Sequence, residues 1–220
     1  MEWISNIKNI DFSGNKYSQT GEEVIAKYIF DNIGTTDKYF VDLGAGGYGN
    51  GNFMSNTRKF MEDGWSGLMI DKAARGVPDI KEYTLTPENI VSILEKENVP
   101  FEFDFLSVDI DSFDFFILEQ TLLNYRPRVV CTEFNASLPP NSSLVLKYEE
   151  GYFFDNTNKY GYSFGAGKKL FEELGYTLIY NHLNLDLFAV RKDIVNQDCG
   201  VTAKQVVNFP INQSAVWENY

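Results

Sequence analysis

The sequence has few of the features that mark secreted, membrane or disulfide-rich proteins. It contains only two cysteines, Cys131 in an apolar run and Cys199 in a polar tail, and no apolar run near the ~20 residues that a membrane span needs. The N-terminal stretch MEWISNIKNIDFSGN lacks the basic and apolar regions of a signal peptide. We therefore expect no disulfide framework, no membrane insertion and a reducing, cytoplasmic location.

Basic residues are also scarce. The chain has 19 lysines and arginines against 31 acids, which gives a net charge of -12. Such a charge repels phosphate backbones and anionic lipids, so nucleic acid is not an expected partner. No internal repeat or proline-rich linker divides the chain, and its 44% apolar and 15% aromatic residues are typical of a packed globule. We expect one domain over 1–220.

Apolar periodicity predicts strands and helices that alternate along the chain. Strand-like runs cover 38–43, 66–71, 80–85, 101–110, 128–134, 176–182 and 185–191, and helical patterns cover 18–33, 55–63, 86–98, 112–124 and 165–174. This alternation predicts an α/β fold with a mostly parallel sheet and helices on both faces. About two residues join the last two runs, too few for a crossover helix, so these strands should form an antiparallel hairpin.

Three segments fall outside the main alternation. Residues 1–37 are an N-terminal helical segment, 136–164 are an insertion or lid after a strand, and 194–220 are a C-terminal tail. The insertion is rich in aromatic residues that either offer flat faces to an acceptor or pack into a small core of their own: Tyr148, Tyr152, Phe153, Phe154, Tyr160 and Tyr162. In the tail, Val216 and Trp217 are candidates for docking on the body of the protein or on a partner.

A glycine-rich loop follows the first predicted strand in YFVDLGAGGYGNGN (39–52). Gly44, Gly46 and Gly49 match the G-x-G-x-x-G fingerprint of a dinucleotide site, and Asp71 follows at roughly its ~20-residue spacing. Three features argue against an NAD-dependent oxidoreductase. They are the C-terminal hairpin, the long segment before the first strand and the absence of Tyr-x-x-x-Lys. Parallel strands that close in a hairpin are the Rossmann-like arrangement of class I S-adenosylmethionine-dependent methyltransferases.

The chain resembles the FkbM-like methyltransferases over roughly 17–193. The resemblance rests on YSQTGEE (17–23), on 40–71, on LSVDIDSFDFFILE (106–119) followed by VVCTEFN (129–135), and on the ending 161–193. Its most specific part is S-x-D-I-D-x-x-D with the later T-E-F-N. Two departures are Ser112, where relatives commonly have glycine, and a longer first loop. The resemblance implies a seven-stranded sheet and methyl transfer from S-adenosylmethionine to a hydroxyl of a sugar or glycan acceptor.

Candidate cofactor residues lie at the carboxyl ends of the first two strands. An acid at the start of the loop, Asp42, can hold the ammonium group of the cofactor, and the amides of the loop and of the next helix can hold its carboxylate. Asp71 can accept both ribose hydroxyls. The full candidate set is Gln19, Asp42, Gly44, Gly46, Asn56, Thr57, Asp71 and Asp109. For each, the alternative is a structural role such as a turn or a helix cap.

Four acids, Asp109, Asp111, Asp114 and Glu133, follow two apolar runs that should be neighbouring strands, ~4.8 Å apart. If they converge in one cleft, either one takes up a proton or a divalent cation, Mg²⁺ or Mn²⁺, neutralises them. We expect Asp109, Asp111 and Glu133 as metal ligands, and Asp111 or Asp114 as the general base. The alternative is a solvated acidic loop.

The lone histidine, His182, is a further catalytic candidate, although single histidines are more often packed or exposed residues.

The sequence leaves open two functions of different classes. One is an O-methyltransferase acting on a sugar, and the other is a non-catalytic or partner-dependent binding module that retains the fold.

Overall fold

The computed structural model describes residues 1–48 and 52–220, and its main feature is a seven-stranded sheet. The strands of this sheet, in spatial order, are β5 (Ile80–Glu82), β4 (Ser66–Asp71), β1 (Tyr39–Leu43), β6 (Glu102–Val108), β7 (Arg126–Glu133), β10 (Asp186–Arg191) and β9 (Tyr176–His182). β5, β4, β1, β6 and β7 are mutually parallel. β10 is antiparallel to both β7 and β9. The predicted sheet and its terminal hairpin are confirmed.

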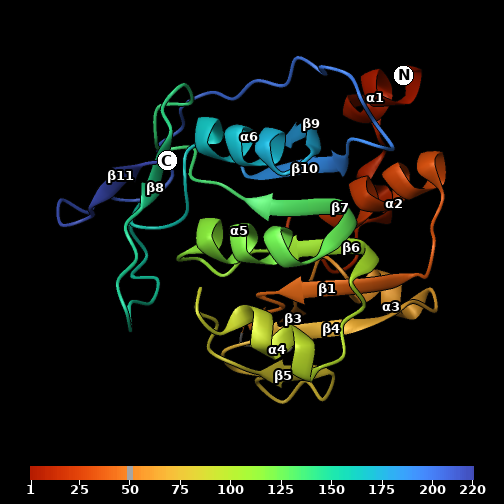
Figure 1. Ribbon diagram of the computed structural model, residues 1–220, viewed down its shortest axis with the longest axis horizontal. Coiled ribbons are helices and arrows are strands. Elements are labelled where there is room, and N and C mark those ends of the chain that lie inside the picture. The colour runs from red at the N-terminus through yellow and green to blue at the C-terminus, as the bar shows by residue number, and fades with distance from the viewer. Residues whose placement is uncertain (49–51) are drawn as a thin grey trace.

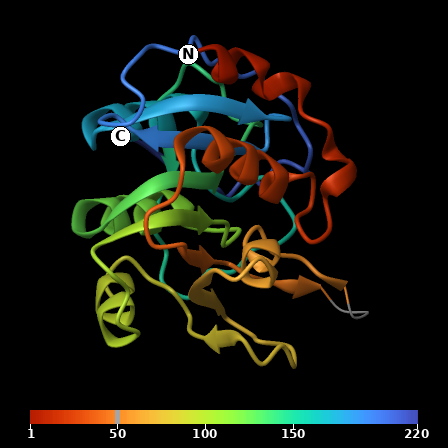
Figure 2. The ribbon, with the colours of Figure 1, turned by 90° about the vertical axis from the view of Figure 1, so that its right-hand side faces the viewer.

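Helices cover both faces of the sheet, as the sequence predicts. On one face lie α4 (Ile90–Lys96), α5 (Asp114–Asn124) and α6 (Phe164–Glu173), and on the other lie α1 (Glu2–Asn6), α2 (Glu22–Ile33) and α3 (Arg58–Glu62) (Figures 1 and 2). Two short 3-10 turns, Ile7–Asn9 and Phe12–Gly14, connect α1 to α2.

Alternate residues of each strand face these two helical layers. In β1, Val41 and Leu43 join the apolar core beneath α4, α5 and α6, whereas Phe40 joins the core beneath α1, α2 and α3. By this alternation Asp42 faces the layer of Phe40. The apolar strand pattern therefore leaves one acid of β1 on the α2–α3 side, at the carboxyl end of the strand.

The second helix begins later than predicted. Its pattern predicts a start near residue 18, but α2 begins at Glu22 after Gly21, whose φ of 113° is a left-handed conformation. The carboxylates of Glu22 and Glu23 accept backbone N–H groups from the preceding residues, including Thr20 and Ser18. Acids in the first turn of α2 thus hold the preceding backbone in place, and residues 18–20 form a loop.

The insertion and the tail are joined to each other at the carboxyl end of the parallel strands. β8 (Leu144–Leu146) in the insertion pairs antiparallel with β11 (Trp217–Asn219) in the tail (Figure 1). Trp217 lies in this pairing, whereas Val216 is 56% exposed. A further small ribbon, β2 (Gly47–Tyr48) with β3 (Asn52–Phe53), flanks the glycine loop. Among the described residues, no helix has the length and apolar character of a membrane span.

Candidate active site

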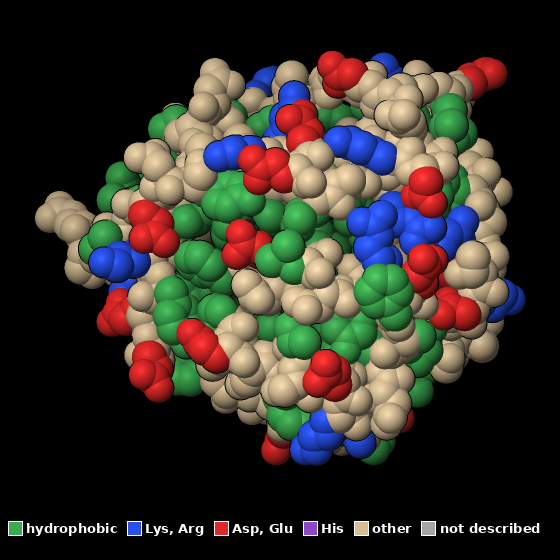
Figure 3. Space-filling view, in the orientation of Figure 1, with side chains coloured by type: hydrophobic (Ala, Val, Ile, Leu, Met, Phe, Trp, Pro, Cys, Tyr) green, Lys and Arg blue, Asp and Glu red, His purple; other side chains and the backbone are tan. Residues whose placement is uncertain are grey.

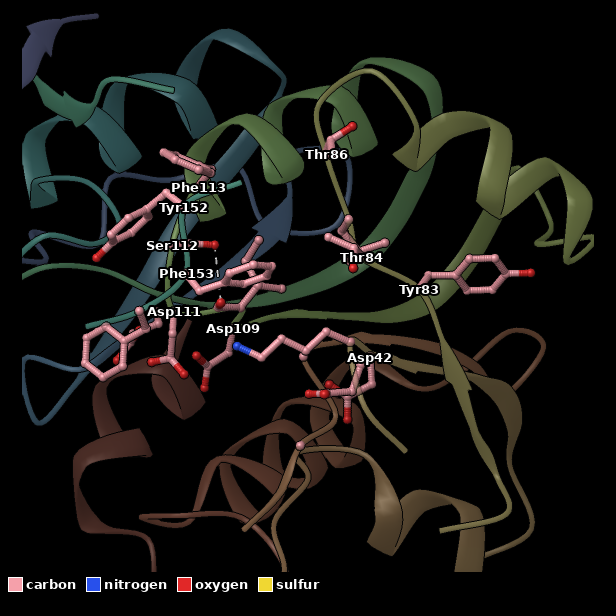
Figure 4. Close-up of a pocket in the computed structure, with 18 of the residues that line it drawn as sticks. Asp42, Tyr83, Thr84, Thr86, Asp109, Asp111, Ser112, Phe113, Tyr152 and Phe153 are labelled. Carbon is pink, nitrogen blue, oxygen red and sulfur yellow. Dashed lines mark hydrogen bonds between the residues drawn. The ribbon is translucent and has the colours of Figure 1, made fainter. Parts of the chain in front are cut away.

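A cavity of about 640 Å³ opens at the carboxyl ends of β1, β4, β5, β6 and β7. This is the edge where open α/β sheets bind ligands, and the volume suits a cofactor together with an acceptor. The loops after β1, β4, β5 and β6 line it, together with residues of the insertion and the tail. In Figure 4 the carboxylates of Asp109 and Asp111 point in the same direction within this cavity. Most of the predicted cofactor candidates, and three of the five catalytic candidates, therefore share one space.

The glycine loop is required for a close approach of two strand ends. Gly44 has φ of 100°, and a Cβ at this position would lie 1.6 Å from the carbonyl oxygen of Asp109. A Cβ on Gly46 would lie 3.1 Å from Oδ2 of Asp71. Both glycines line the cavity. Their missing side chains leave the backbone of this loop open to a ligand, while Gly49 of the predicted fingerprint lies outside the described residues.

Asp42 is 2% exposed and is held by hydroxyls. Its Oδ2 accepts hydrogen bonds from Ser55 Oγ and from Thr57 Oγ1, each at 2.7 Å. Burial raises the pKa of Asp42 above its ordinary value, and these hydrogen bonds act in the opposite direction. Thr57 is completely buried, so it contacts no ligand directly and acts only through Asp42. The pair fixes the start of α3 against the end of β1.

Three other cofactor candidates reach the cavity itself. Asn56 lines it and donates a hydrogen bond to Ser107 Oγ at 3.1 Å. Gln19 lines it from the loop before α2. Asp71 ends β4, where its Oδ1 accepts the backbone N–H of Ala73 at 2.8 Å and its Oδ2 remains beside Gly46. One carboxylate oxygen thus orders the turn after β4, and the other is available to a ligand.

The acid cluster forms as the sequence predicts for three of its four members. Asp109, Asp111 and Glu133 each present an oxygen within 4.8 Å of the others. Glu133 is 9% exposed, and its Oε2 has no hydrogen-bond partner among the described residues. The pKa values of Asp109 and Glu133 are raised well above the ordinary carboxyl range, first by burial and then by the neighbouring carboxylates.

Asp114 lies behind this cluster and has a different role. Its two oxygens accept the backbone N–H groups of Ile110 at 2.7 Å and Ser112 at 2.9 Å. Between them lies Asp111, which has an uncommon φ of 57°. Burial raises the pKa of Asp114 to about 6. Asp114 does not line the cavity, so it positions Asp111 and is not itself placed to contact an acceptor.

Comparison with solved structures gives a match to a methyltransferase. MycE, the methyltransferase from the mycinamycin biosynthetic pathway solved with Mg and SAH (S-adenosylhomocysteine), aligns over 89% of this chain with a TM-score of 0.50 and 14% identity. A second structure of MycE, with Mg, SAH and mycinamycin VI, aligns with a TM-score of 0.49 and the same identity. The chain spans 56% of the length of MycE.

The fold is that of a class I methyltransferase. No family model and no curated protein matches the sequence. The resemblance to the FkbM-like methyltransferases therefore remains a prediction that rests on the motifs quoted above, and the likeness to MycE at this identity concerns the fold alone.

The residues of the acid cluster suit a hard divalent cation. Oxygen ligands are what Mg²⁺ and Mn²⁺ prefer, and three carboxylates from two neighbouring strand ends supply them. The unpartnered Oε2 of Glu133 is a buried acceptor that a cation would satisfy. Without such a partner, burial of these three groups would cost free energy.

His182 is not in this cavity. It is 2% exposed, its ring stacks on Phe12 at 5.3 Å, and its Nε2 lies 3.1 Å from the carbonyl oxygen of Thr20. The histidine therefore packs beneath the loop before α2, and the structure gives it no access to an acceptor from the cavity. These surroundings favour the interpretation of His182 as a packed residue over that of a catalytic one.

Some aromatic residues of the insertion pack into its own core, and others line the cavity. Tyr160 and Tyr162 are buried, and the hydroxyl of Tyr162 donates to Thr132 Oγ1 at 3.0 Å. The other four predicted aromatics line the cavity, namely Tyr148, Tyr152, Phe153 and Phe154. Lining residues that the sequence does not single out are Lys72 and Tyr83 near the cofactor candidates, and Phe113 and Phe209 near the insertion.

Proposed function

We propose that this protein is an S-adenosylmethionine-dependent O-methyltransferase of the FkbM-like group that methylates a hydroxyl of a sugar or glycan. The observation that carries the proposal is the meeting of Asp109, Asp111 and Glu133 within 4.8 Å in the same cavity as Gly44, Gly46 and Asp71. A cofactor half and an acid half thus share one space. The SAH and Mg that appear with MycE are consistent with both halves.

The cofactor half offers complementary groups to the two ends of S-adenosylmethionine. Asp71 would accept hydrogen bonds from the ribose hydroxyls, and the bare backbone of Gly44 and Gly46 would leave room for the rest of the cofactor. Asn56 and Gln19 offer amide groups to its amino-acid part. The bound cofactor supplies a methyl carbon attached to a positively charged sulfur, which is the electrophile.

The acid half serves the acceptor. Asp109, Asp111 and Glu133 would hold Mg²⁺ or Mn²⁺, which would supply a positive charge that lowers the pKa of an acceptor hydroxyl. The cofactor would supply the methyl carbon to which the acceptor oxygen bonds, and its sulfur would leave with the electron pair of the broken carbon–sulfur bond. The hydroxyl proton passes to the carboxylate of Asp111, which Asp114 holds toward the cavity through its two backbone contacts.

Alignment is the larger contribution of the protein in this reaction. Positioning of two reactants lowers the activation barrier by ~7–11 kcal/mol, and a positioned base raises the rate by a further factor of ~10²–10⁴.

The two cysteines bear on the location of this activity. Cys131 and Cys199 are both free, which supports a reducing compartment such as the cytoplasm.

The test is methyl transfer by Asp111→Asn and Glu133→Gln, with SAH binding measured by calorimetric titration. We expect loss of most turnover and retained SAH binding in both variants. Asp198→Asn, at an exposed acid of the tail, is the matched control and should keep full activity. Removal of divalent cations with EDTA should stop the reaction, and Mg²⁺ or Mn²⁺ should restore it. Full activity of both amide variants would refute the assignment.

The same experiment separates the alternatives. A non-catalytic or partner-dependent binding module would bind SAH but would methylate no glycan in the assay. An NAD-dependent oxidoreductase would bind NAD tightly and ignore SAH. The antiparallel β9–β10 hairpin and the acid cluster support the methyltransferase over both.

A further inference from the structure

An apolar wall lines the cavity beside the acid cluster, and the chemistry proposed above does not use it. Phe153 from the insertion and Phe209 from the tail both line the cavity, yet they are 51% and 36% exposed. Exposed phenylalanines at a cavity mouth cost free energy in water. Such a surface commonly marks a site where an apolar part of a ligand binds.

The wall is built from two segments distant in the sequence. The ring of Phe154 lies 5.5 Å from that of Phe209, and Tyr160 lies 5.9 Å from Phe209, both in edge-on packing. Phe113, which follows the acid cluster, packs against Tyr152 at 5.8 Å. Figure 4 shows Phe113, Tyr152 and Phe153 on the same side of the cavity. The aromatic surface therefore begins directly beside the acids.

Hydrogen bonds fix this wall in place. The backbone N–H of Asn158 donates to the carbonyl oxygen of Pro210 at 3.0 Å, and the N–H of Asn212 donates to Asn158 Oδ1 at 2.7 Å. These contacts bracket Phe209 and join the tail to the insertion. A site held by rigid elements loses little conformational entropy on binding. The wall is thus pre-formed for a ligand.

The tail has further exposed apolar side chains close to Phe209 in the sequence. Val206, Val207 and Ile211 are 37%, 59% and 69% exposed, within three residues of Phe209 along the chain. A sugar ring alone is too small and too polar to cover such a surface. A ligand with an apolar group attached to its sugar would cover it while the sugar hydroxyl lies at the acids.

Charged side chains line the cavity beside this aromatic surface. Asp109, Asp111 and Glu133 line it, and Glu149 lines it from the insertion. Lys72 acts on both groups. Its Nζ lies 5.0 Å from the ring centre of Phe153, and its charge opposes the burial that raises the pKa of Asp111. The aromatic surface, which is not occupied by these charges, therefore sets the class of ligand.

We propose that the acceptor is a glycoside whose apolar aglycone binds against Phe153 and Phe209. The inference rests on the proposed methyl transfer to a sugar hydroxyl, and it names the class of sugar derivative. It makes Phe153 and Phe209 determinants of acceptor specificity, with no part in holding the cofactor.

The test compares methyl and n-hexyl glycosides of the same neutral hexoses and deoxyhexoses, in the presence of Mg²⁺. Binding to the SAH-bound protein is measured by calorimetric titration, and methyl transfer is measured with labelled S-adenosylmethionine. The native protein should prefer the hexyl over the methyl glycoside by at least about tenfold, as expected when roughly half of two phenylalanine side chains is buried. Phe153→Ala combined with Phe209→Ser should remove this preference and leave SAH affinity unchanged.

Phe101→Ala is the matched control, because Phe101 is 61% exposed but precedes β6, at the opposite edge of the sheet. It should keep the full preference. Equal binding of methyl and hexyl glycosides, or a preference that survives in the double variant, would overturn the inference. Preferred binding of the hexyl glycoside without any methyl transfer would support the apolar subsite while refuting the proposed reaction.

Discussion

The carboxylate of Glu133 is expected to destabilise the protein when no cation is bound, and Glu133→Gln tests this expectation directly. The side chain is almost entirely buried, its Oε2 has no partner among the described residues, and it lies within 4.8 Å of the carboxylates of Asp109 and Asp111. Two ionised carboxylates at that separation repel each other by about 3.5 kcal/mol at an effective dielectric constant of about 20. Glutamine has the same shape and carries no charge.

The expected gain in stability is smaller than this repulsion, because burial and the neighbouring carboxylates raise the pKa of Glu133 and so favour uptake of a proton, which relieves the repulsion. The folded-state pKa of Glu133 is raised above its unfolded value, so the folded protein binds more protons than the unfolded one between these two pKa values. The stability of the native protein should therefore fall as the pH rises through that window. We expect Glu133→Gln to gain about 1–3 kcal/mol at pH 8, and less at pH 5.

The assay is thermal unfolding with and without Mg²⁺ or Mn²⁺. For a domain of this size the expected gain raises Tm by roughly 2–4 °C per kcal/mol. The native protein should also gain stability when the cation is added, more at pH 8 than at pH 5, while Glu133→Gln should lose most of this response. Glu95→Gln, at an exposed position of α4, is the control and should change neither quantity. A less stable Glu133→Gln, or an unchanged response to the cation, would refute the reasoning.

Three further substitutions test neighbouring parts of the structure. Asp71→Ala should weaken SAH binding by ~1.5–3 kcal/mol in calorimetric titration, because it removes a charged hydrogen-bond acceptor, and an unfolded variant would instead show that Asp71 is structural. Asp114→Asn should lower kcat while SAH affinity is retained, because one of the backbone N–H groups beside Asp111 loses its acceptor; an unchanged kcat would argue against positioning. Asp104→Ala should cost about 3–5 kcal/mol in urea unfolding, because it leaves the buried Arg128 without its partner at 2.7 Å. Because its pKa is lowered in the fold, the contribution of Asp104 is present at neutral pH and should be lost below about pH 4.

The fold could be predicted because each element has a strong local pattern. The strand runs are apolar and short, and Gly175, with φ of 81°, separates α6 from β9 where the sequence predicts a helix end. The hairpin followed from the length of a single connection. The predicted start of α2 was wrong by about one turn. The apolar pattern gives no sign that the carboxylates of Glu22 and Glu23 accept the backbone N–H groups of Thr20 and Ser18, which holds these residues in a loop.

The site could be predicted only where chemistry follows directly from position in a strand. Asp109 comes immediately after β6 and Glu133 is the last residue of β7, so their meeting at one edge follows from parallel pairing. Phe209 lies in a tail without periodicity, and only the tertiary contacts with Asn158 place it at the cavity. Likewise, the sequence cannot separate Thr57, which is buried behind Asp42, from Asn56, which faces the ligand space.

The acids at the two ends of β6 and β7 have opposite electrostatic surroundings, and this difference distinguishes a structural acid from a candidate functional one. Near the amino ends of β6 and β7, Asp104 is satisfied by Arg128 and by the backbone N–H groups of Thr36 and Lys38, and its pKa is lowered. At the carboxyl ends, burial and the neighbouring carboxylates raise the pKa values of Asp109 and Glu133, and the charge of Lys72 acts on Asp111 of the same cluster. On the face drawn in Figure 3, Lys and Arg side chains are mixed with Asp and Glu, so the fold has bases with which to neutralise acids. Arg128 compensates Asp104, whereas the buried Oε2 of Glu133 has no hydrogen-bond partner among the described residues. A ligand that carries positive charge would offset the cost of burying this oxygen, as proposed above.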